Sequence, residues 1–144
     1  MKYNFYEKNA ISVSPIDNKF NKISNPFVLY DMLSKIWSKE TCAPRMRDKW
    51  TKDNKTLGQC SITAFLAQDI FGGEVYGIPL GDGNFHCFNK VNDSKFDLTS
   101  EQFLPIKLDY NNVIKQSRDI HFNKLEKKER YEFLKQKLLE MLGN

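Results

Sequence analysis

Apolar residues recur at helical spacing in three segments of the chain, and these segments predict its helices. Residues 25–39 begin with Asn25-Pro26, a capping residue followed by the residue that best fits the first helical position. Residues 60–71 are apolar on most sides, which is typical of a helix buried in the centre of a domain. Residues 124–142 carry one apolar stripe, which comprises Leu125, Tyr131, Leu134, Leu138 and Met141/Leu142. We therefore expect a central buried helix flanked by an N-terminal and a C-terminal helix.

Between the second and third predicted helices the pattern becomes typical of strands. Residues 74–80, 84–91 and 95–99 form three short runs, separated by the turn sequences Gly81-Asp82-Gly83 and Asn92-Asp93-Ser94. A short helical turn is expected at residues 99–103. These elements predict an α+β fold in which the central helix packs on a small antiparallel sheet.

The length and composition predict one domain with a substantial core. The chain has 144 residues, of which 40% are apolar and 13% aromatic. Residues 1–24 are polar and irregular, so we expect an irregular N-terminal extension or a loosely packed strand pair there, and a single domain over residues 25–144. Residues 40–57 are expected to form a charged loop.

The charge and the cysteines narrow the class of protein. The net charge is +4, but acids alternate with the lysines and no basic patch or nucleic-acid motif is present, so no nucleic-acid partner is expected. No run of 18 apolar residues predicts a membrane span, and the N-terminus lacks an apolar signal core, which favours the cytoplasm. The three cysteines, Cys42, Cys60 and Cys87, contain no C-x-x-C pair and are expected to be free thiols there.

Cys60 is the first candidate for chemistry, because it begins the central helix in the sequence Gly58-Gln59-Cys60. The first turn of a helix presents unpaired N–H groups and a partial positive charge, which favour a thiolate over a thiol. The same N–H groups can stabilise an oxyanion on a bound carbonyl. The alternative is that Cys60 is a small apolar residue that fills the core.

A nucleophilic cysteine usually needs a base and a group that orients the base. His86 lies in the middle of the second predicted strand and Asp97 in the middle of the third. If these strands pair as a hairpin, the two side chains can be neighbours on one face of the sheet, and the helix of Cys60 is expected to pack across that face. The other histidine, His121, is expected at the surface. The order Cys60, His86, Asp97 thus predicts a catalytic triad.

A zinc site is the other interpretation of these residues. Cys42, Cys60, His86 and Cys87 provide four ligands in number, but His86 and Cys87 are adjacent on a strand and point to opposite faces. We therefore expect no metal and no cofactor.

Beyond this chemistry, the chain resembles the YunG-like family of small bacterial proteins over roughly residues 29–142. The resemblance depends on ordered motifs, which are Trp37-Ser38-Lys39-Glu40-Thr41, Trp50, Gly58-Gln59-Cys60, Gln68-Asp69 with Phe71-Gly72-Gly73, Asp97-Leu98-Thr99 with Gln102-Phe103, Arg118 and Arg130-Tyr131-Glu132. The family looks like a compact relative of the papain-like and transglutaminase-like cysteine enzymes. The resemblance therefore implies a papain-like core and a triad of Cys60, His86 and Asp97.

The expected function is acyl transfer by a cysteine enzyme: amide hydrolysis, deamidation or transamidation of a peptide, a protein or a small amide. Gln59 is a candidate oxyanion donor, with Asn84 or the Cys60 backbone N–H as alternatives. Trp50 is either a wall over the cleft or a core anchor for its loop. The rival hypothesis is a non-catalytic module of the same fold, an adaptor or immunity protein that binds a peptide or protein.

Overall fold

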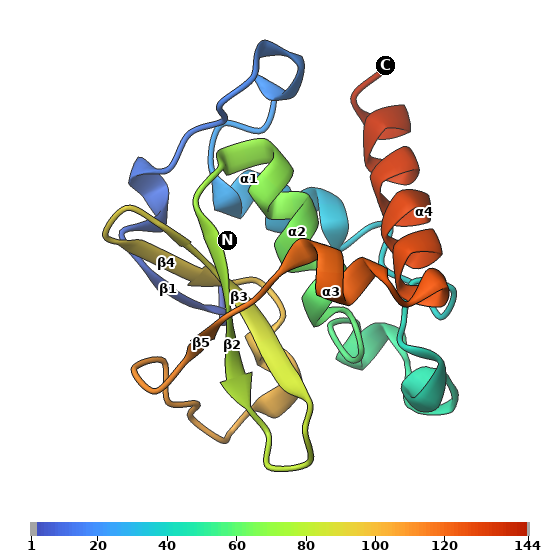
Figure 1. Cartoon of the computed structure of the whole chain (residues 1–144). Helices are drawn as coiled ribbons and strands as arrows, with labels where there is room; N and C mark the ends of the chain where they lie inside the picture. The colour runs from blue at the N-terminus through green and yellow to red at the C-terminus, as the bar shows by residue number, and fades with distance from the viewer. Residues whose placement is uncertain (1–2, 144) are drawn as a thin grey trace.

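A five-stranded antiparallel sheet organises the structure, a computed structural model that describes residues 3–143. Its strands are β1 (Tyr6–Lys8), β2 (Glu74–Pro79), β3 (Phe85–Val91), β4 (Ser94–Asp97) and β5 (Ile114–Lys115). They are arranged in the order β1-β4-β3-β2-β5, so β3 is the central strand (Figure 1). The predicted hairpin is confirmed, because β3 pairs with β4 through the turn after Val91.

Four α-helices accompany the sheet in the described residues. They are α1 (Pro26–Leu33), α2 (Cys60–Phe71), α3 (Arg118–Phe122) and α4 (Leu125–Met141). Short 3-10 turns occupy Ala10–Ser12, Asn18–Phe20, Pro44–Lys49, Lys52–Asn54 and Ser100–Phe103. The fold is therefore α+β, as predicted, and none of these helices is long and apolar enough to span a membrane.

Helix α2 lies in the middle of the molecule, between β3 on one side and α4 on the other (Figure 1). Its few polar side chains have partners inside the protein: Thr63 Oγ1 accepts a hydrogen bond from Trp37 Nε1 at 3.0 Å. From the sheet, Asn89 Nδ2 donates to the Ala64 carbonyl at 2.8 Å. These bonds explain how a helix that is buried on nearly all sides keeps its polar groups satisfied.

Two predicted helices differ from the observed ones. The first ends at Leu33 rather than near residue 39, and tight backbone bonds such as Trp37 N–H to Leu33 O at 2.8 Å then direct Trp37 into the core. In the last helix, Leu125 is 69% exposed and does not belong to the buried stripe. Arg130 is buried there instead, because its guanidinium donates to the Thr41 carbonyl at 2.9 Å.

Residues 3–24, expected as an irregular extension or a loosely packed strand pair, pack into the domain. Phe5, Ala10, Val13, Phe20 and Ile23 are all buried in the main core. Strand β1 also pairs with β4, with Tyr6 opposite Asp97. These apolar residues are too irregularly spaced to show a period, so their burial depends on tertiary packing alone.

The two faces of the sheet carry different clusters. The helical face, which α2 covers, includes Val75, Cys87 and Asn89. The outer face includes Ile78 and Phe88, which pack with Tyr110 in a smaller cluster. Because side chains alternate along a strand, His86 belongs to the outer face and its neighbours Phe85 and Cys87 to the helical face.

Candidate functional site

His86 and Asp97 form a buried pair on the outer face. His86 Nε2 lies 2.7 Å from Asp97 Oδ2, and each of the two residues is 1% exposed. The hairpin of β3 and β4 brings them together, which confirms the predicted proximity of these two side chains. A carboxylate at this depth needs polar partners, and the histidine is the first of them.

The segment after β4 covers this pair and completes its hydrogen bonds. Tyr110 donates its hydroxyl hydrogen to Asp97 Oδ2 at 2.7 Å, and the backbone N–H of Thr99 donates to Oδ1 at 3.3 Å. The His86 ring packs edge-on against Phe103, with 4.7 Å between ring centroids. Since Nε2 of His86 faces Asp97, Nδ1 is the nitrogen left to exchange a proton with another group.

Helix α2 does not pack across the face that carries His86 and Asp97, which corrects the expected arrangement. It lies on the helical face, and Cys60 instead lies beside Phe85, at the start of the central strand β3. Leu80 N–H donates to the Asn84 carbonyl, so the backbone groups of Phe85 point away from β2 toward the β4 side. Because β4 ends at Asp97, that part of the β3 edge is open, and Cys60 Sγ lies 3.9 Å from the Phe85 carbonyl oxygen there.

This edge position explains how one sulfur can interact with both faces. Phe85 is followed by His86, which points to the outer face, and by Cys87, which points to the helical face. Hydrogen bonding from the Cys87 thiol is the largest cause that holds the pKa of Cys60 well below its usual value. Burial acts against this lowering, and the hydrogen bonding and charge of His86 add to it.

The partners of Cys60 shift in the matching directions. Burial alone lowers the pKa of His86, but the Asp97 carboxylate and the Cys60 thiolate more than offset it and raise the pKa to about 10. The Cys60 thiolate and burial raise the pKa of Cys87 well above its usual value. At neutral pH these directions describe a Cys60 thiolate beside a protonated His86, with Cys87 as a neutral thiol.

The loop before α2 sets the position of Cys60. Gly58 has φ +71°, and a Cβ atom there would lie 2.6 Å from Cys42 Sγ and 2.9 Å from Ala43 N, so only glycine fits. Gln102 ties this loop to the segment after β4, because its Nε2 donates to the Thr56 and Thr99 carbonyls at 3.1 and 2.9 Å. Cys60 itself is half-buried and is one of three free thiols. The first N–H groups of α2, beginning at Cys60, remain free of helical partners by geometry.

The structure does not bring the other predicted site residues to Cys60. Gln59 is fully buried, and its Nε2 donates to the Ser38 carbonyl at 3.1 Å, away from the thiol. Asn84 is bound to Asp82, because its backbone N–H donates to Asp82 Oδ1 at 2.9 Å and its side chain also hydrogen-bonds to that carboxylate. Trp50 is 9% exposed and donates from Nε1 to the Lys55 carbonyl at 2.9 Å, which matches the core-anchor interpretation. Of the proposed oxyanion donors, the backbone N–H groups of α2 therefore remain.

Tyr110 and Cys87 are site residues that the sequence pattern did not identify as such. Tyr110 lies in a polar segment without periodicity, and Cys87 was considered only as a zinc ligand. The one available signal was for Cys87, which directly follows His86 in the sequence. Among the described residues, no group of three or more His, Cys, Asp or Glu side chains is arranged to hold a metal ion.

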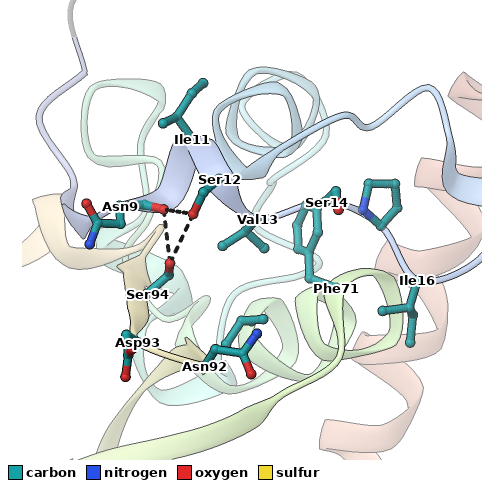
Figure 2. A pocket seen from close by; sticks show the side chains of 12 residues that line it. Asn9, Ile11, Ser12, Val13, Ser14, Ile16, Phe71, Asn92, Asp93 and Ser94 are labelled. Carbon is teal, nitrogen blue, oxygen red and sulfur yellow. Dashed lines mark hydrogen bonds between the residues drawn. The ribbon is translucent and has the colours of Figure 1, made fainter.

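A hollow of about 560 Å³ lies elsewhere, between residues 9–16 and the β3–β4 turn (Figure 2). Ser94 Oγ donates to the Asn9 carbonyl at 3.0 Å on its rim, and Phe71, the last residue of α2, forms part of its wall. Helix α2 has 12 residues and is about 18 Å long, so Phe71 and Cys60 lie at opposite ends of it. The hollow contains no cysteine or histidine and is separate from the candidate site.

The fold and the site together define an α+β protein with a cysteine at a helix start, a buried histidine–carboxylate pair and a sheet edge where they meet. The YunG protein family matches residues 25–143, and the chain belongs to this family. It is also 36% identical over 72 residues to a protein of Bacillus subtilis strain 168 described as "Uncharacterized protein YunG". That match spans 50% of this chain and 57% of the relative. No solved structure matches the chain.

Proposed function

We propose that the protein is a cysteine-dependent acyl-transfer enzyme of the papain-like class, with Cys60 as nucleophile, His86 as acid and base, and Asp97 as the group that orients His86. The observation that carries this proposal is the buried 2.7 Å pair of His86 and Asp97 next to the half-buried Cys60 thiol. A histidine that is held by a carboxylate and faces a cysteine at a helix start is the arrangement that cysteine nucleophiles need.

The pKa directions define the starting state of the reaction. With the pKa of Cys60 lowered and that of His86 raised to about 10, the proton already resides on the imidazole at neutral pH. Cys60 therefore attacks as a thiolate, and His86 does not have to remove its proton in the first step.

The steps then balance without a cofactor. The thiolate forms a C–S bond with an amide or thioester carbonyl, and the N–H groups at the start of α2 stabilise the oxyanion. The C–N bond of an amide (or the C–S bond of the substrate thioester) breaks as His86 gives its proton to the leaving group. Water or an amine then attacks the acyl-enzyme, His86 takes the proton, and Cys60 leaves as a thiolate. Three free thiols fit a reducing compartment, so we place the protein in the cytoplasm.

Alkylation of Cys60 tests this proposal. The second-order rate constant with iodoacetamide at pH 7, measured by peptide mass spectrometry, should exceed that of glutathione about tenfold or more, because a lowered pKa increases the thiolate fraction. His86→Gln should reduce the rate about tenfold or more, since the charged neighbour of the thiolate is removed.

Two controls define what each outcome means. Cys60→Ala should abolish labelling with a melting temperature within a few degrees of wild type, whereas Cys42→Ser should leave the labelling of Cys60 unchanged. The rival hypothesis of a non-catalytic peptide-binding module predicts that His86→Gln leaves the rate at Cys60 unchanged. That outcome would reject the triad.

A further inference from the structure

Three side chains outside the triad form a hydrogen-bonded chain. Gln116 Oε1 lies 2.8 Å from His121 Nε2, and Lys127 Nζ lies 2.9 Å from His121 Nδ1. An ammonium can only donate, so Nδ1 accepts from Lys127 and Nε2–H donates to Gln116. His121 is therefore neutral, in agreement with burial and the Lys127 charge, which lower its pKa to about 4.

This hydrogen-bonded chain begins with Gln116 on the helical face of the sheet, beside Gly77 and Phe85. A Cβ atom on Gly77 would lie 2.5 Å from Gln116 Nε2 and 2.8 Å from Phe85 Cβ, so the missing side chain at 77 makes room for the Gln116 amide beside Phe85. Phe85 is the residue whose carbonyl contacts Cys60 Sγ. The Gln116 amide and the Cys60 thiol therefore both lie close to Phe85.

Helix α3 holds His121 against α2. The His121 ring lies 5.2 Å from the Phe65 ring, centroid to centroid. Arg118, at the start of α3, donates to the Phe65 carbonyl at 3.0 Å and pairs with Asp69 at 2.7 Å. His121 is thus half-buried, contrary to the expected surface position, and Lys127 lies against its ring at Nδ1.

Lys127 differs from the other buried or half-buried cations of α3 and α4. Arg118 and Lys135 pair with Asp69, and Arg130 pairs with Glu126. In the described part of the chain Lys127 pairs with no carboxylate and binds the neutral His121 instead. Burial lowers the pKa of Lys127, whereas the negative charge of the Cys60 thiolate acts to raise it. A half-buried ammonium without a paired carboxylate is costly, and a carboxylate that binds beside it reduces that cost.

We infer that Lys127, oriented by His121 and Gln116, binds an anionic group of the substrate, a carboxylate close to the carbonyl that Cys60 attacks. This inference rests on the proposed function, because it assigns the substrate class of the same site. The substrate would then be an acyl compound with a free carboxylate near the reacting carbon, such as an acidic amide or an acidic side chain of a peptide. Lys127 acts in binding and not as a second nucleophile.

Two alkylating reagents that differ only in charge test this inference. Iodoacetate carries a carboxylate next to the carbon that the thiolate attacks, and iodoacetamide carries a neutral amide there. The rate constants of both reagents with Cys60 are measured at pH 7 and low ionic strength, and their ratio reports the local charge. Lys127→Met should lower the iodoacetate-to-iodoacetamide ratio about fivefold or more, because one nearby positive charge is lost.

The matched control is Lys128→Met, the exposed neighbour on the same helix, which should leave the ratio unchanged within about twofold. Lys127→Gln keeps a donor for His121 Nδ1 and should also lower the ratio. If Lys127→Met fails to fold, Lys127→Gln is used in its place. An unchanged ratio in the folded variant, with both reagents still modifying Cys60, overturns the inference and leaves the proposed function intact. If wild-type Cys60 reacts no faster than glutathione with iodoacetamide, the proposed function fails, and the inference fails with it.

Discussion

Tyr110 and Asp97 are joined by a buried hydrogen bond of 2.7 Å from the tyrosine hydroxyl to the carboxylate oxygen that also binds His86. Tyr110 stacks on Tyr6 with 3.7 Å between ring centroids and thereby links the edge strand β1 to the centre of the site. Burial and the Asp97 charge raise the pKa of Tyr110, so the hydroxyl stays protonated and remains a donor.

Tyr110→Phe should lower the free energy of unfolding by about 1–3 kcal/mol, because a buried bond to a charged group is lost while the ring remains. Denaturant unfolding measures this change. The labelling rate of Cys60 should fall much less than in Asp97→Asn, since His86 keeps its carboxylate. A Tyr110→Phe variant as stable as wild type would contradict the importance of this bond.

The pH dependence of Cys60 alkylation follows from the shifted pKa values. At a pH below its pKa of about 8.5, an ordinary thiol reacts about tenfold faster for each unit by which the pH rises, because the thiolate fraction increases. Because the pKa of Cys60 lies well below its usual value, its rate should be nearly constant between about pH 7 and 8.5. Stopped-flow or quenched labelling at each pH measures the profile.

Asp97→Asn should move this profile toward that of an ordinary thiol. The Asp97 carboxylate is the largest cause that raises the pKa of His86, and without it burial favours the neutral ring. The imidazolium that stabilises the thiolate is then lost at neutral pH. If the asparagine variant keeps the wild-type plateau, His86 does not support the thiolate.

His86 should also make the stability depend on pH, and Cys60→Ala isolates its effect. The pKa of His86 is raised from 6.5 in the unfolded chain, so its contribution is fully present below pH 6.5 and is lost as the pH rises through the folded-state value. That value is about 10 with Cys60 present, and it is lower without the thiolate, where Asp97 acts to raise it against the effect of burial.

In the Cys60→Ala background the free energy of unfolding should therefore decrease as the pH rises above 6.5. The wild type is less suitable, because the lowered pKa of Cys60 has the opposite effect on stability. The Cys60 thiolate stabilises the folded protein at high pH, and this contribution decreases as the pH falls below the pKa of a free thiol. The double variant Cys60→Ala/His86→Gln should lack the decrease. If the free energy of unfolding depends on pH equally in the single and double variants, the pKa of His86 is not raised by its partners.

Gly58→Ala should destabilise the protein by about 2–4 kcal/mol, because it combines a positive φ with a clash against backbone and sulfur atoms. The closest of these atoms are Ala43 N at 2.9 Å and Cys42 Sγ at 2.6 Å from the new Cβ. Thermal or denaturant unfolding measures the loss, and labelling of Cys60 should slow, since the loop before α2 has to move.

Gly81→Ala is the matched control for this substitution. Gly81 also has a positive φ, +87°, but a Cβ atom there meets nothing within 4 Å. Gly81→Ala should lower the free energy of unfolding by about 1–2 kcal/mol, because it adds only the strain of a positive φ and no clash. Equal losses in the two variants would mean that the contact between Gly58 and Cys42 does not constrain the loop.

The sequence by itself determined the elements whose signals are local. Helix α2 runs from Cys60 to Phe71, as its apolar character and the glycines after it predicted. The hairpin of β3 and β4 was also predicted, and with it the pairing of His86 and Asp97, because the two residues are separated by a single tight turn. Such features depend on backbone preferences and on near neighbours in the chain, which a sequence pattern records.

Only the tertiary structure decided how distant segments meet. It placed α2 on the helical face and not on the face of His86, included residues 3–24 in the core, and brought Tyr110 to Asp97 and Lys127 to His121. These outcomes depend on which apolar surfaces become buried together and on single hydrogen bonds, such as that between Asn89 and Ala64. No periodicity along the chain records such contacts, because each is a choice among many partners of similar hydrophobicity.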